Sequence, residues 1–320
     1  MRVLLTGATG FVGRAVLERL AASEGLESVA SLRGPALPDC PPNVSTVHVN
    51  GLDAETDWSS ALDQVQVVIH CAARAHVMQD TEADPLAAFR KVNVEGTLNL
   101  ARQAVRQGVR RFVFISSIKV NGEGTPLNQP YAADAPPAPM DPYGVSKMEA
   151  EQGLRQIARD SGMDVVIIRP VLVYGPGVRA NFLNMMRWLD KGIPLPLGAI
   201  HNRRSMVALD NLADLIMICI DHPAAANQTF LISDGVDLST TQLLARMGQA
   251  LGKPAWLLPV PSRWLEWGAQ LLGQQALSQR LCGSLQVDIS KTRQLLGWTP
   301  ALNVDAAVAL AANHYKARQR

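Results

Sequence analysis

The chain has 320 residues, of which 48% are hydrophobic and 18% are charged, and its formal net charge is +2. This length predicts one large globular domain or up to two domains with an ample core. A protein whose net charge is so close to zero does not attract the phosphates of a nucleic acid strongly, so we expect no nucleic-acid partner.

The N-terminus and the cysteines favour a cytoplasmic protein. The opening residues MRVLLTG are typical of a strand and lack the long apolar core of a secretory signal. The longest apolar run, LIMICI at 215–220, is too short to cross a bilayer, so we expect no integral membrane segment. None of the four cysteines has metal-ligand spacing, which favours reduced thiols and no metal site.

Apolar runs alternate with helical patterns along the first half of the chain. Continuous apolar strands separated by helices predict an α/β fold with a Rossmann-type, doubly wound parallel sheet. Ligands bind such sheets where the carboxyl ends of the strands meet. Strands are predicted at 2–5, 28–32, 46–49, 65–70, 111–115 and 165–169, and helices at 12–23, 85–107 and 143–161.

The pattern loosens after residue 169, where Pro, Gly and Trp become more frequent. We interpret 1–170 with about 203–235 as a dinucleotide-binding domain, in which MVALD and TFLIS supply further strands. We interpret 171–202 with about 236–320 as a smaller α/β domain that binds the substrate. Its stretch WLLPVPSRWLEWGAQLL at 256–272 could form an interfacial or partner helix, but we expect ordinary packing inside the small domain.

The first predicted strand runs into TGATGFVG, which has the spacing G-x-x-G-x-x-G. Glycines here permit a tight turn, close approach of a pyrophosphate and close packing of helix on sheet. The N–H groups at the start of the next helix then face the anion. A plain tight turn is the alternative. We expect this segment to bind a dinucleotide through Gly7, Thr9, Gly10, Phe11, Val12 and Gly13.

The end of the second predicted strand bears on the cofactor type. An acidic residue there hydrogen-bonds the adenosine ribose of NAD, but this sequence has Ser31, Leu32 and Arg33. A guanidinium pairs well with a 2′-phosphate, which favours NADP(H), with NAD(H) possible. Alternatively, Arg33 is a solvated loop residue.

Tyr143 and Lys147 are four residues apart in PYGVSK, on one face of a predicted helix. An isolated phenol has a pKa near 10. A nearby ammonium favours the phenolate, so the pair is suited to proton transfer during hydride transfer. Ser117, at the end of the preceding strand, can hydrogen-bond the same substrate oxygen, and Ser116 is its rival. A solvated helical pair is the alternative interpretation of Tyr143 and Lys147.

Several motifs together resemble the extended short-chain dehydrogenase/reductase family, in its nucleotide-sugar epimerase, dehydratase and reductase branch. The resemblance covers nearly the whole chain, and the glycine loop and the Tyr-x-x-x-Lys motif are its most specific parts. The remaining motifs are VIHCAA at 68–73, VNVEGT at 92–97, FVFISSIKVNG at 112–122, RPVLVYGPG at 169–177, and DISK with LGWTP within 288–300.

The resemblance implies roles for individual residues. Tyr143 would be the acid/base, Lys147 would tune its pKa and bind the ribose, and Ser117 would contact the reacting substrate oxygen. Asn93 matches an asparagine that supports the active site, although a helix cap or an ordinary helical position is an equal alternative. Further cofactor contacts are implied for Leu52, Asp53, Cys71, Ala72, Ala73 and Pro170. In the family, the acidic residue that contacts the adenine stands two positions before Asp53, where this chain has Gly51.

The same resemblance implies a UDP-linked sugar as substrate. Arg204 matches the family arginine that reaches the diphosphate, and Asn181 an asparagine near the phosphates. Arg280 is a possible second cation, with Arg203 and Arg179 as competitors. Each of these arginines could instead be an ordinary surface charge.

Dehydratases of this branch carry an Asp-Glu pair after the catalytic Ser or Thr, where this chain has Ile118 and Lys119. Isoleucine cannot transfer protons, so dehydration is disfavoured. Because no acid follows the second strand and Arg33 stands there, we favour a reductase over an epimerase. The resemblance implies that its substrate is the C4 ketone of a UDP-4-keto-6-deoxy-N-acetylhexosamine, as in O-antigen synthesis. The alternative is a UDP-sugar 4-epimerase, of the UDP-glucose or UDP-N-acetylglucosamine type, with tightly held NAD.

Rivals outside this chemistry are a cofactor sensor, a structural subunit, and a reductase for a non-nucleotide ketone. The sensor is disfavoured because both Tyr143 and Lys147 are present. Members of the family often form homodimers through their two long helices, here about 85–107 and 143–161. We therefore expect a homodimer with a four-helix contact.

Overall fold

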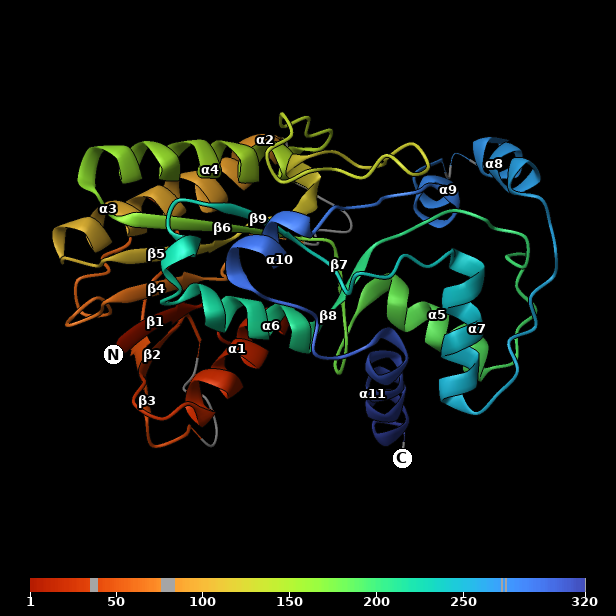
Figure 1. The fold of residues 1–320 in the computed structure, drawn as a ribbon, viewed down its shortest axis with the longest axis horizontal. Helices are drawn as coiled ribbons and strands as arrows, with labels where there is room; N and C mark the ends of the chain where they lie inside the picture. The colour runs from red at the N-terminus through yellow and green to blue at the C-terminus, as the bar shows by residue number, and fades with distance from the viewer. Residues whose placement is uncertain (35–39, 76–83, 272, 274, 320) are drawn as a thin grey trace.

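The computed structural model describes residues 1–34, 40–75, 84–271, 273 and 275–319. At its centre is a seven-stranded parallel sheet with the order β3-β2-β1-β4-β5-β6-β9 (Figure 1). The predicted doubly wound parallel sheet is confirmed. The strands are β1 (Arg2–Thr6), β2 (Glu27–Leu32), β3 (Val44–His48), β4 (Val67–His70), β5 (Arg111–Ile115), β6 (Asp164–Pro170) and β9 (Thr229–Ile232).

The chain direction across the sheet reverses at β1, because β2 and β3 lie on one side of it and β4 and the later strands on the other. Register pairs Thr6 with His70, so β1 and β4 end together. Loops that leave the carboxyl ends of two such strands diverge to opposite faces and open a crevice between them. This crevice is where the fold places its ligand.

Helices cover both faces of the sheet (Figure 1). On one face lie α2 (Pro85–Arg90), the π-helical turn η1 (Lys91–Gly96), α3 (Thr97–Arg106) and α4 (Pro142–Ser161). On the other face lie α1 (Phe11–Ala22), α6 (Leu209–Cys219) and α10 (Ser290–Leu296). Two short 3₁₀ turns, η2 (Ile118–Val120) and η3 (Pro223–Ala225), lie in the connections. The predicted single helix over 85–107 is thus interrupted by a π-helical turn around Asn93.

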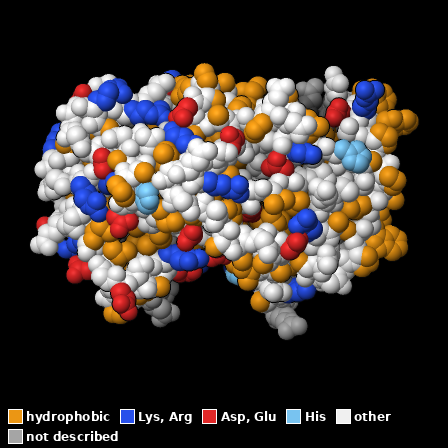
Figure 2. All heavy atoms as spheres, in the orientation of Figure 1, with side chains coloured by type: hydrophobic (Ala, Val, Ile, Leu, Met, Phe, Trp, Pro, Cys, Tyr) orange, Lys and Arg blue, Asp and Glu red, His pale blue; other side chains and the backbone are white. Residues whose placement is uncertain are grey.

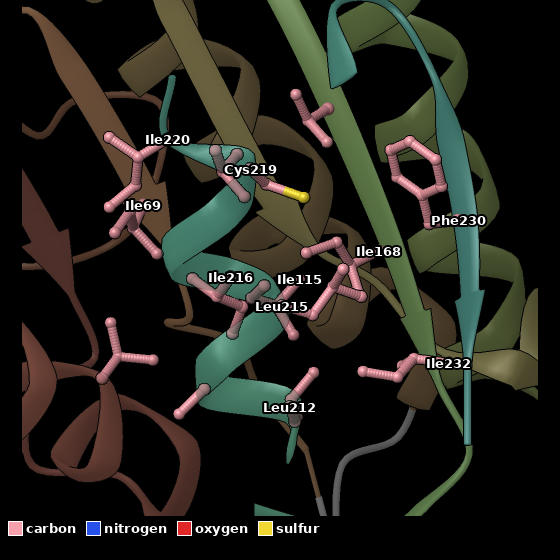
Figure 3. Close-up of a cluster of buried hydrophobic side chains, with 14 of the residues drawn as sticks. Ile69, Ile115, Ile168, Leu212, Leu215, Ile216, Cys219, Ile220, Phe230 and Ile232 are labelled. Carbon is pink, nitrogen blue, oxygen red and sulfur yellow. The ribbon is translucent and has the colours of Figure 1, made fainter. Parts of the chain in front are cut away.

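Aliphatic side chains fasten α6 to the sheet. Figure 3 shows the strand residues Ile69, Ile115 and Ile168 facing Leu212 and Ile216 of α6, and all five are buried. Each fully buried aliphatic side chain of this size contributes about 1.5–3 kcal/mol relative to exposure. This packing holds the strand ends, and therefore the crevice, in fixed positions.

A second, smaller core lies beyond the ends of the strands. Its sheet consists of β7 (Leu172–Tyr174) and β8 (Met206–Ala208), which pair in parallel. The predicted strand in MVALD therefore forms as β8 but pairs with β7 instead of extending the large sheet, whereas TFLIS joins it as β9. The helices of this part are α5 (Ala180–Asp190), α7 (Thr240–Leu251), α8 (Ser262–Leu271), α9 (Gln275–Cys282) and α11 (Val304–Ala317).

Buried polar contacts join the two parts. The Tyr174 hydroxyl donates to Oδ2 of Asp234 at 2.7 Å, and Asn211 Nδ2 donates to its Oδ1 at 2.7 Å. Burial raises the pKa of the Asp234 carboxyl above its ordinary value. Ile289 and Trp298, from the segment assigned to the smaller domain, are buried in the core of the large sheet. The predicted division into domains otherwise stays a prediction.

Within the described ranges, no helix combines the length and apolarity that a bilayer crossing requires.

Candidate active site

The glycine loop between β1 and α1 lies against the loop that follows β4. Gly7 has a φ of +74°, and a Cβ added to it would lie 2.7 Å from the backbone nitrogen of Ala72. A Cβ on Gly13 would overlap the carbonyl oxygen of Gly7. These contacts require glycine at both positions. The helix α1 begins after Gly10 with no described side chain capping it and no acid in its first turn, so its N–H groups suit a pyrophosphate.

A buried histidine, which the sequence analysis missed, holds this loop to α3. His70 Nδ1 lies 2.7 Å from Thr6 Oγ1, and its Nε2 lies 2.9 Å from Thr97 Oγ1. The backbone N–H of Ala72 also donates to Thr6 Oγ1, at 3.2 Å. Burial, with the Lys147 ammonium nearby, lowers the pKa of His70 to about 3, so the ring is neutral. The network fixes the ends of β1 and β4.

Tyr143 lies in the first turn of α4, and the side chain of Ser117, which follows β5, acts to lower the pKa of its phenol. Asp141 caps this helix by accepting from the backbone N–H of Gly144 at 2.6 Å. Burial and, next, the Asp141 carboxylate raise the pKa of Tyr143 to about 12. Burial therefore dominates the pKa of this phenol, and the pKa-lowering role expected of Lys147 stays a prediction.

Lys147, one helical turn further along α4, is only 2% exposed. Its Nζ donates to the carbonyl oxygen of Ile115 at 2.8 Å and lies 4.3 Å from the ring centroid of Phe114. Burial lowers the pKa of Lys147 to about 8, and burial raises the pKa of the nearby Cys71 thiol to about 12. The Lys147 ammonium is therefore held at the ends of β4 and β5, beside the crevice.

The two adjacent serines have different partners. Ser116 is buried, and its hydroxyl donates to Oε1 of Glu151 at 2.6 Å. Arg169 donates to both oxygens of that carboxylate, at 2.8 and 2.6 Å. Ser116 therefore belongs to a buried ionic network, whereas Ser117 is partly exposed, and the assignment of Ser117 as the substrate partner stays a prediction. The sequence held a signal for this network, because Tyr143, Lys147 and Glu151 recur every four residues on α4.

Asn93, in the π-helical turn, links the β4 loop to α4. Its Oδ1 accepts from the backbone N–H of Arg74 at 2.8 Å, and its Nδ2 donates to Ser146 Oγ at 3.0 Å. The Ser146 hydroxyl in turn donates to the carbonyl oxygen of Tyr143 at 2.8 Å. Asn93 thus connects the β4 loop to α4 instead of capping a helix, its role in supporting the site stays a prediction, and Ser146 was missed by the sequence analysis.

The remaining expected cofactor residues lie along the same edge. Arg33 is exposed just after β2. The Asp53 carboxylate accepts from Thr56 Oγ1 at 2.9 Å, and this bond is the main reason that its pKa lies below the ordinary value. Leu52 is buried beside η1, where a Cβ on Gly96 would lie 2.7 Å from the Leu52 carbonyl oxygen. Pro170 is buried at the end of β6. After β4, Cys71, Ala72 and Ala73 are partly exposed. In the glycine loop, Thr9 and Gly10 are exposed, and Phe11 and Val12 are half-buried.

Two cations, Arg204 and Arg280, lie in the smaller part of the molecule, where the charge of one acts on the other. Arg204 Nη1 donates to the carbonyl oxygen of Gly283 at 3.0 Å. Burial and, next, the charge of Arg280 on α9 lower the pKa of Arg204. Among the described residues, neither guanidinium has an acidic partner within ion-pair distance. Guanidinium groups without an acidic partner suit a diphosphate.

Asn202 positions this arginine pair. Its Nδ2 donates to the carbonyl oxygens of Leu281 and Gly283, at 3.2 and 2.9 Å. The end of α9 is thereby tied to the segment that carries Arg204. Nothing in the local sequence pattern singles out Asn202, because its partners are about 80 residues away. Asn181, also expected near the phosphates, is exposed in the first turn of α5.

Known proteins are similar to this chain in sequence and in fold. Residues 3–233 match the family described as the NAD dependent epimerase/dehydratase family. A UDP-glucose 4-epimerase of Vibrio cholerae is 50% identical over 299 residues, which are 93% of this chain and 90% of that protein. An Escherichia coli O157:H7 epimerase that acts on N-acetylglucosaminyl-diphospho-undecaprenol is 29% identical over 264 residues, which are 81% of this chain and 76% of that protein. A UDP-glucuronic acid 4-epimerase from Bacillus cereus, solved with NAD, has a TM-score of 0.80 at 19% identity over 100% of both chains.

Proposed function

The chain belongs to the NAD-dependent epimerase/dehydratase family, and on that premise we propose that it is a UDP-hexose 4-epimerase that acts on UDP-glucose. The observation that carries this proposal is the 50% identity to a UDP-glucose 4-epimerase over 93% of the chain. This similarity favours the alternative of the sequence analysis over its first preference, reduction of a 4-keto sugar.

The residues at the crevice fit a dinucleotide. The close approach of Gly7 to Ala72 and the uncapped start of α1 form a cradle for its pyrophosphate, and Lys147 is placed to reach a ribose. When bound, the dinucleotide supplies the hydride chemistry that the side chains of the protein lack. We propose NAD(H) as the cofactor. The family description and a structural neighbour solved with NAD support it, and the predicted preference for NADP(H) finds no such support.

Proton handling at the sugar is assigned to Tyr143. With a pKa of about 12 in the ligand-free protein, the phenol is protonated at neutral pH and can donate a proton to a substrate oxygen. Microscopic reversibility requires the same oxygen to remove the proton in the opposite direction, and the Lys147 ammonium one turn away favours that phenolate. Ser117, whose side chain acts on the pKa of Tyr143, can hydrogen-bond the same substrate oxygen as the phenol.

Inversion at C4 would require hydride to leave one face of the sugar ring and to return to the other, so the ring must turn over inside the site. Arg204 and Arg280 can hold the diphosphate in the smaller part of the molecule. Asn181, near the start of α5, is a further candidate for a phosphate contact. Strong contacts to the diphosphate then anchor the nucleotide while the hexose ring turns over. We therefore expect most of the binding energy to come from the UDP half of the substrate.

A 4-ketoreductase stays as the second candidate on one observation. Ser31, Leu32 and Arg33 stand at the end of β2, so no acidic side chain there is available to a ribose 2′-hydroxyl. A reductase consumes reduced cofactor at each turnover, whereas an epimerase returns the hydride it removed.

The deciding experiment incubates purified protein with UDP-glucose and no added cofactor. We expect UDP-galactose to accumulate without a net change in nicotinamide absorbance. Stoichiometric consumption of NADPH with a 4-keto sugar nucleotide, in a preparation that does not interconvert the UDP-hexoses, would show that the chain is a reductase.

Two further expectations stay proposals. The first is a homodimer through a four-helix contact, which α3 and α4 permit because they lie side by side on one face of the sheet (Figure 1). The second is a location in the cytoplasm.

A further inference from the structure

Lys119 joins the two elements that carry the candidate proton-transfer residues. Its Nζ forms an ion pair with the carboxylate of Asp141, the residue that caps α4, and also donates to Oε1 of Glu123 at 3.2 Å. Its backbone N–H donates to Ser117 Oγ at 3.3 Å. One residue therefore contacts both the serine that follows β5 and the cap of the helix that carries Tyr143.

The backbone fixes this junction. A Cβ added to Gly144 would lie 2.8 Å from the carbonyl oxygen of Lys119, so the turn η2 rests directly on the start of α4. Ser117 caps η2 and Asp141 caps α4, each through its own side chain. The side chains of Lys119 and Asp141 are 33% and 28% exposed. The ion pair therefore joins the caps of two touching elements, and its partly exposed position allows substitution without leaving a buried cavity.

Asp141 is the acidic group that acts on the phenol of Tyr143. Burial and, next, the Asp141 carboxylate raise the pKa of Tyr143, whereas the side chain of Ser117 lowers it. A carboxylate makes a nearby phenolate less favourable, and an ammonium paired with that carboxylate offsets its charge. Lys119 is therefore placed to act on the phenol through Asp141.

Local pairs set the charge around this junction. Figure 2 shows charged side chains of both signs scattered over the visible face of the molecule, without a large patch of one sign. Arg90 of α2 is paired with Glu149 of α4 at 2.6 Å, and the Arg74 guanidinium, after β4, lies 5.5 Å from the ring centroid of Phe89. That ring contacts the ring of Tyr143. The charged groups of the surrounding elements are thus Asp141, Lys147 and Glu149 at α4, Arg90 on α2, Arg74 after β4, and Lys119 and Glu123 after β5.

We propose that Lys119 is a positioning residue for proton transfer: its ammonium holds the cap of α4 against the Ser117 turn and offsets the Asp141 charge beside Tyr143. The inference rests on the proposed function, because that function assigns the proton to Tyr143. An ion pair at this exposure contributes little to stability. Its loss should therefore appear in the reaction and not in the melting temperature.

The test is the pH dependence of kcat for conversion of UDP-glucose. Tyr143 must lose its proton before it can accept one from the substrate, so kcat should rise with pH toward the apparent pKa of the phenol in the complex. Lys119→Met leaves the Asp141 charge without its partner and should move this rise to higher pH by at least about half a pH unit, which is a loss of about threefold below the rise. Asp141→Asn keeps an oxygen that can cap α4 but removes the charge, so it should move the rise to lower pH.

Three further variants separate the proposed role from a general effect on folding. Because Lys119 acts through Asp141, adding Lys119→Met to Asp141→Asn should move the rise no further. Lys119→Arg keeps the cation and should give a profile like that of the wild type. Lys253→Met is the matched control, since it breaks another lysine–aspartate pair, with Asp190 at 2.6 Å in the smaller part of the molecule, and should leave the profile unchanged.

A second readout does not depend on turnover. Tyrosine labelled with ¹³C at the ring carbon that bears the hydroxyl reports the protonation of each of the four phenols by NMR, and Tyr143→Phe assigns the resonance of interest. In the protein with its dinucleotide bound, the Tyr143 phenol should lose its proton at higher pH in Lys119→Met than in the wild type.

Three results would overturn the inference: an unchanged profile in Lys119→Met, a loss of activity that is equal at every pH, or a shift that is as large in the Asp141→Asn background as in the wild type. The second of these would show a merely structural role. If the wild type fails to convert UDP-glucose, the proposed function fails instead, and the NMR titration still decides whether Lys119 acts on Tyr143.

Discussion

Ser117, at the end of β5, acts to lower the pKa of the Tyr143 phenol, in the first turn of α4, against the effect of burial. The neighbouring Ser116 is turned toward the core and donates to Glu151 at 2.6 Å. Two adjacent hydroxyl groups therefore belong to two different networks, one open to the crevice and one enclosed.

Replacing each serine by alanine should separate these networks. Ser117→Ala should lower kcat about 10²-fold while the melting temperature changes little, because it removes a hydrogen bond to the reacting oxygen. Ser116→Ala should leave the turnover of folded protein near that of the wild type and lower the free energy of unfolding by about 1–3 kcal/mol, because the buried Glu151 loses a donor. Kinetics and denaturant melts of both variants check this. The reverse pattern would assign the catalytic role to Ser116.

The arginine pair should control substrate affinity. Arg204→Met and Arg280→Met should each raise KM for UDP-glucose with a smaller effect on kcat, because a diphosphate contact is made equally in the ground state and the transition state. Calorimetric titration with UDP gives the same affinity loss without turnover. Arg203→Met, at the exposed neighbour of Arg204, is the control. Unchanged UDP affinity in both variants would remove the arginines from the site.

Arg33 tests the cofactor preference. If NAD(H) is the cofactor, Arg33→Ala should leave its Kd within about twofold, because an exposed guanidinium contributes little to a ligand without a 2′-phosphate. Titration of the cofactor-free protein with NADH and NADPH measures both affinities. Tighter binding of NADPH by the wild type, lost in Arg33→Ala, would restore the preference for NADP(H).

The lowered pKa of Lys147 predicts that the difference in stability between the wild type and Lys147→Met depends on pH. The pKa of Lys147 falls from 10.5 in the unfolded chain to about 8 in the fold, so burial of the ammonium is unfavourable below pH 8. As pH rises from 8 to 10.5, the folded state releases this proton first, and the wild type gains stability relative to Lys147→Met. The gain should reach at most about 3 kcal/mol.

Denaturant melts of both proteins at neutral pH and near pH 10 measure that difference, and groups common to both proteins cancel. A difference that stays constant with pH would show that Lys147 keeps its ordinary pKa in the fold.

The sequence was sufficient for the large sheet and the crevice because both depend on local patterns. Apolar runs marked the strands, and the glycine spacing marked the turn that Ala72 approaches. Tyr143 and Lys147 were found because a helix brings residues four apart to one face. These signals lie within a few residues of one another.

What the sequence left open depends on distant contacts. Ser146 and Asn202 act through partners about 50 and 80 residues away, which no periodicity reveals. The raised pKa of Tyr143 follows from burial, which is known only after the chain has folded. The tryptophans of α8 were expected inside because large apolar residues usually are, but they are exposed, and only the packing of Leu265 shows which side of the helix is attached.

The central claim is that the phenol of Tyr143 moves the proton during epimerisation, and one pair of variants tests it most directly. Tyr143→Phe removes that oxygen, and Tyr315→Phe removes another buried phenol on the distant α11. Steady-state conversion of UDP-glucose to UDP-galactose should fall about 10²–10⁴-fold in Tyr143→Phe and stay near the wild-type rate in Tyr315→Phe, with NAD still bound to both proteins. A Tyr143→Phe protein that converts UDP-glucose as fast as the Tyr315→Phe control would contradict the account.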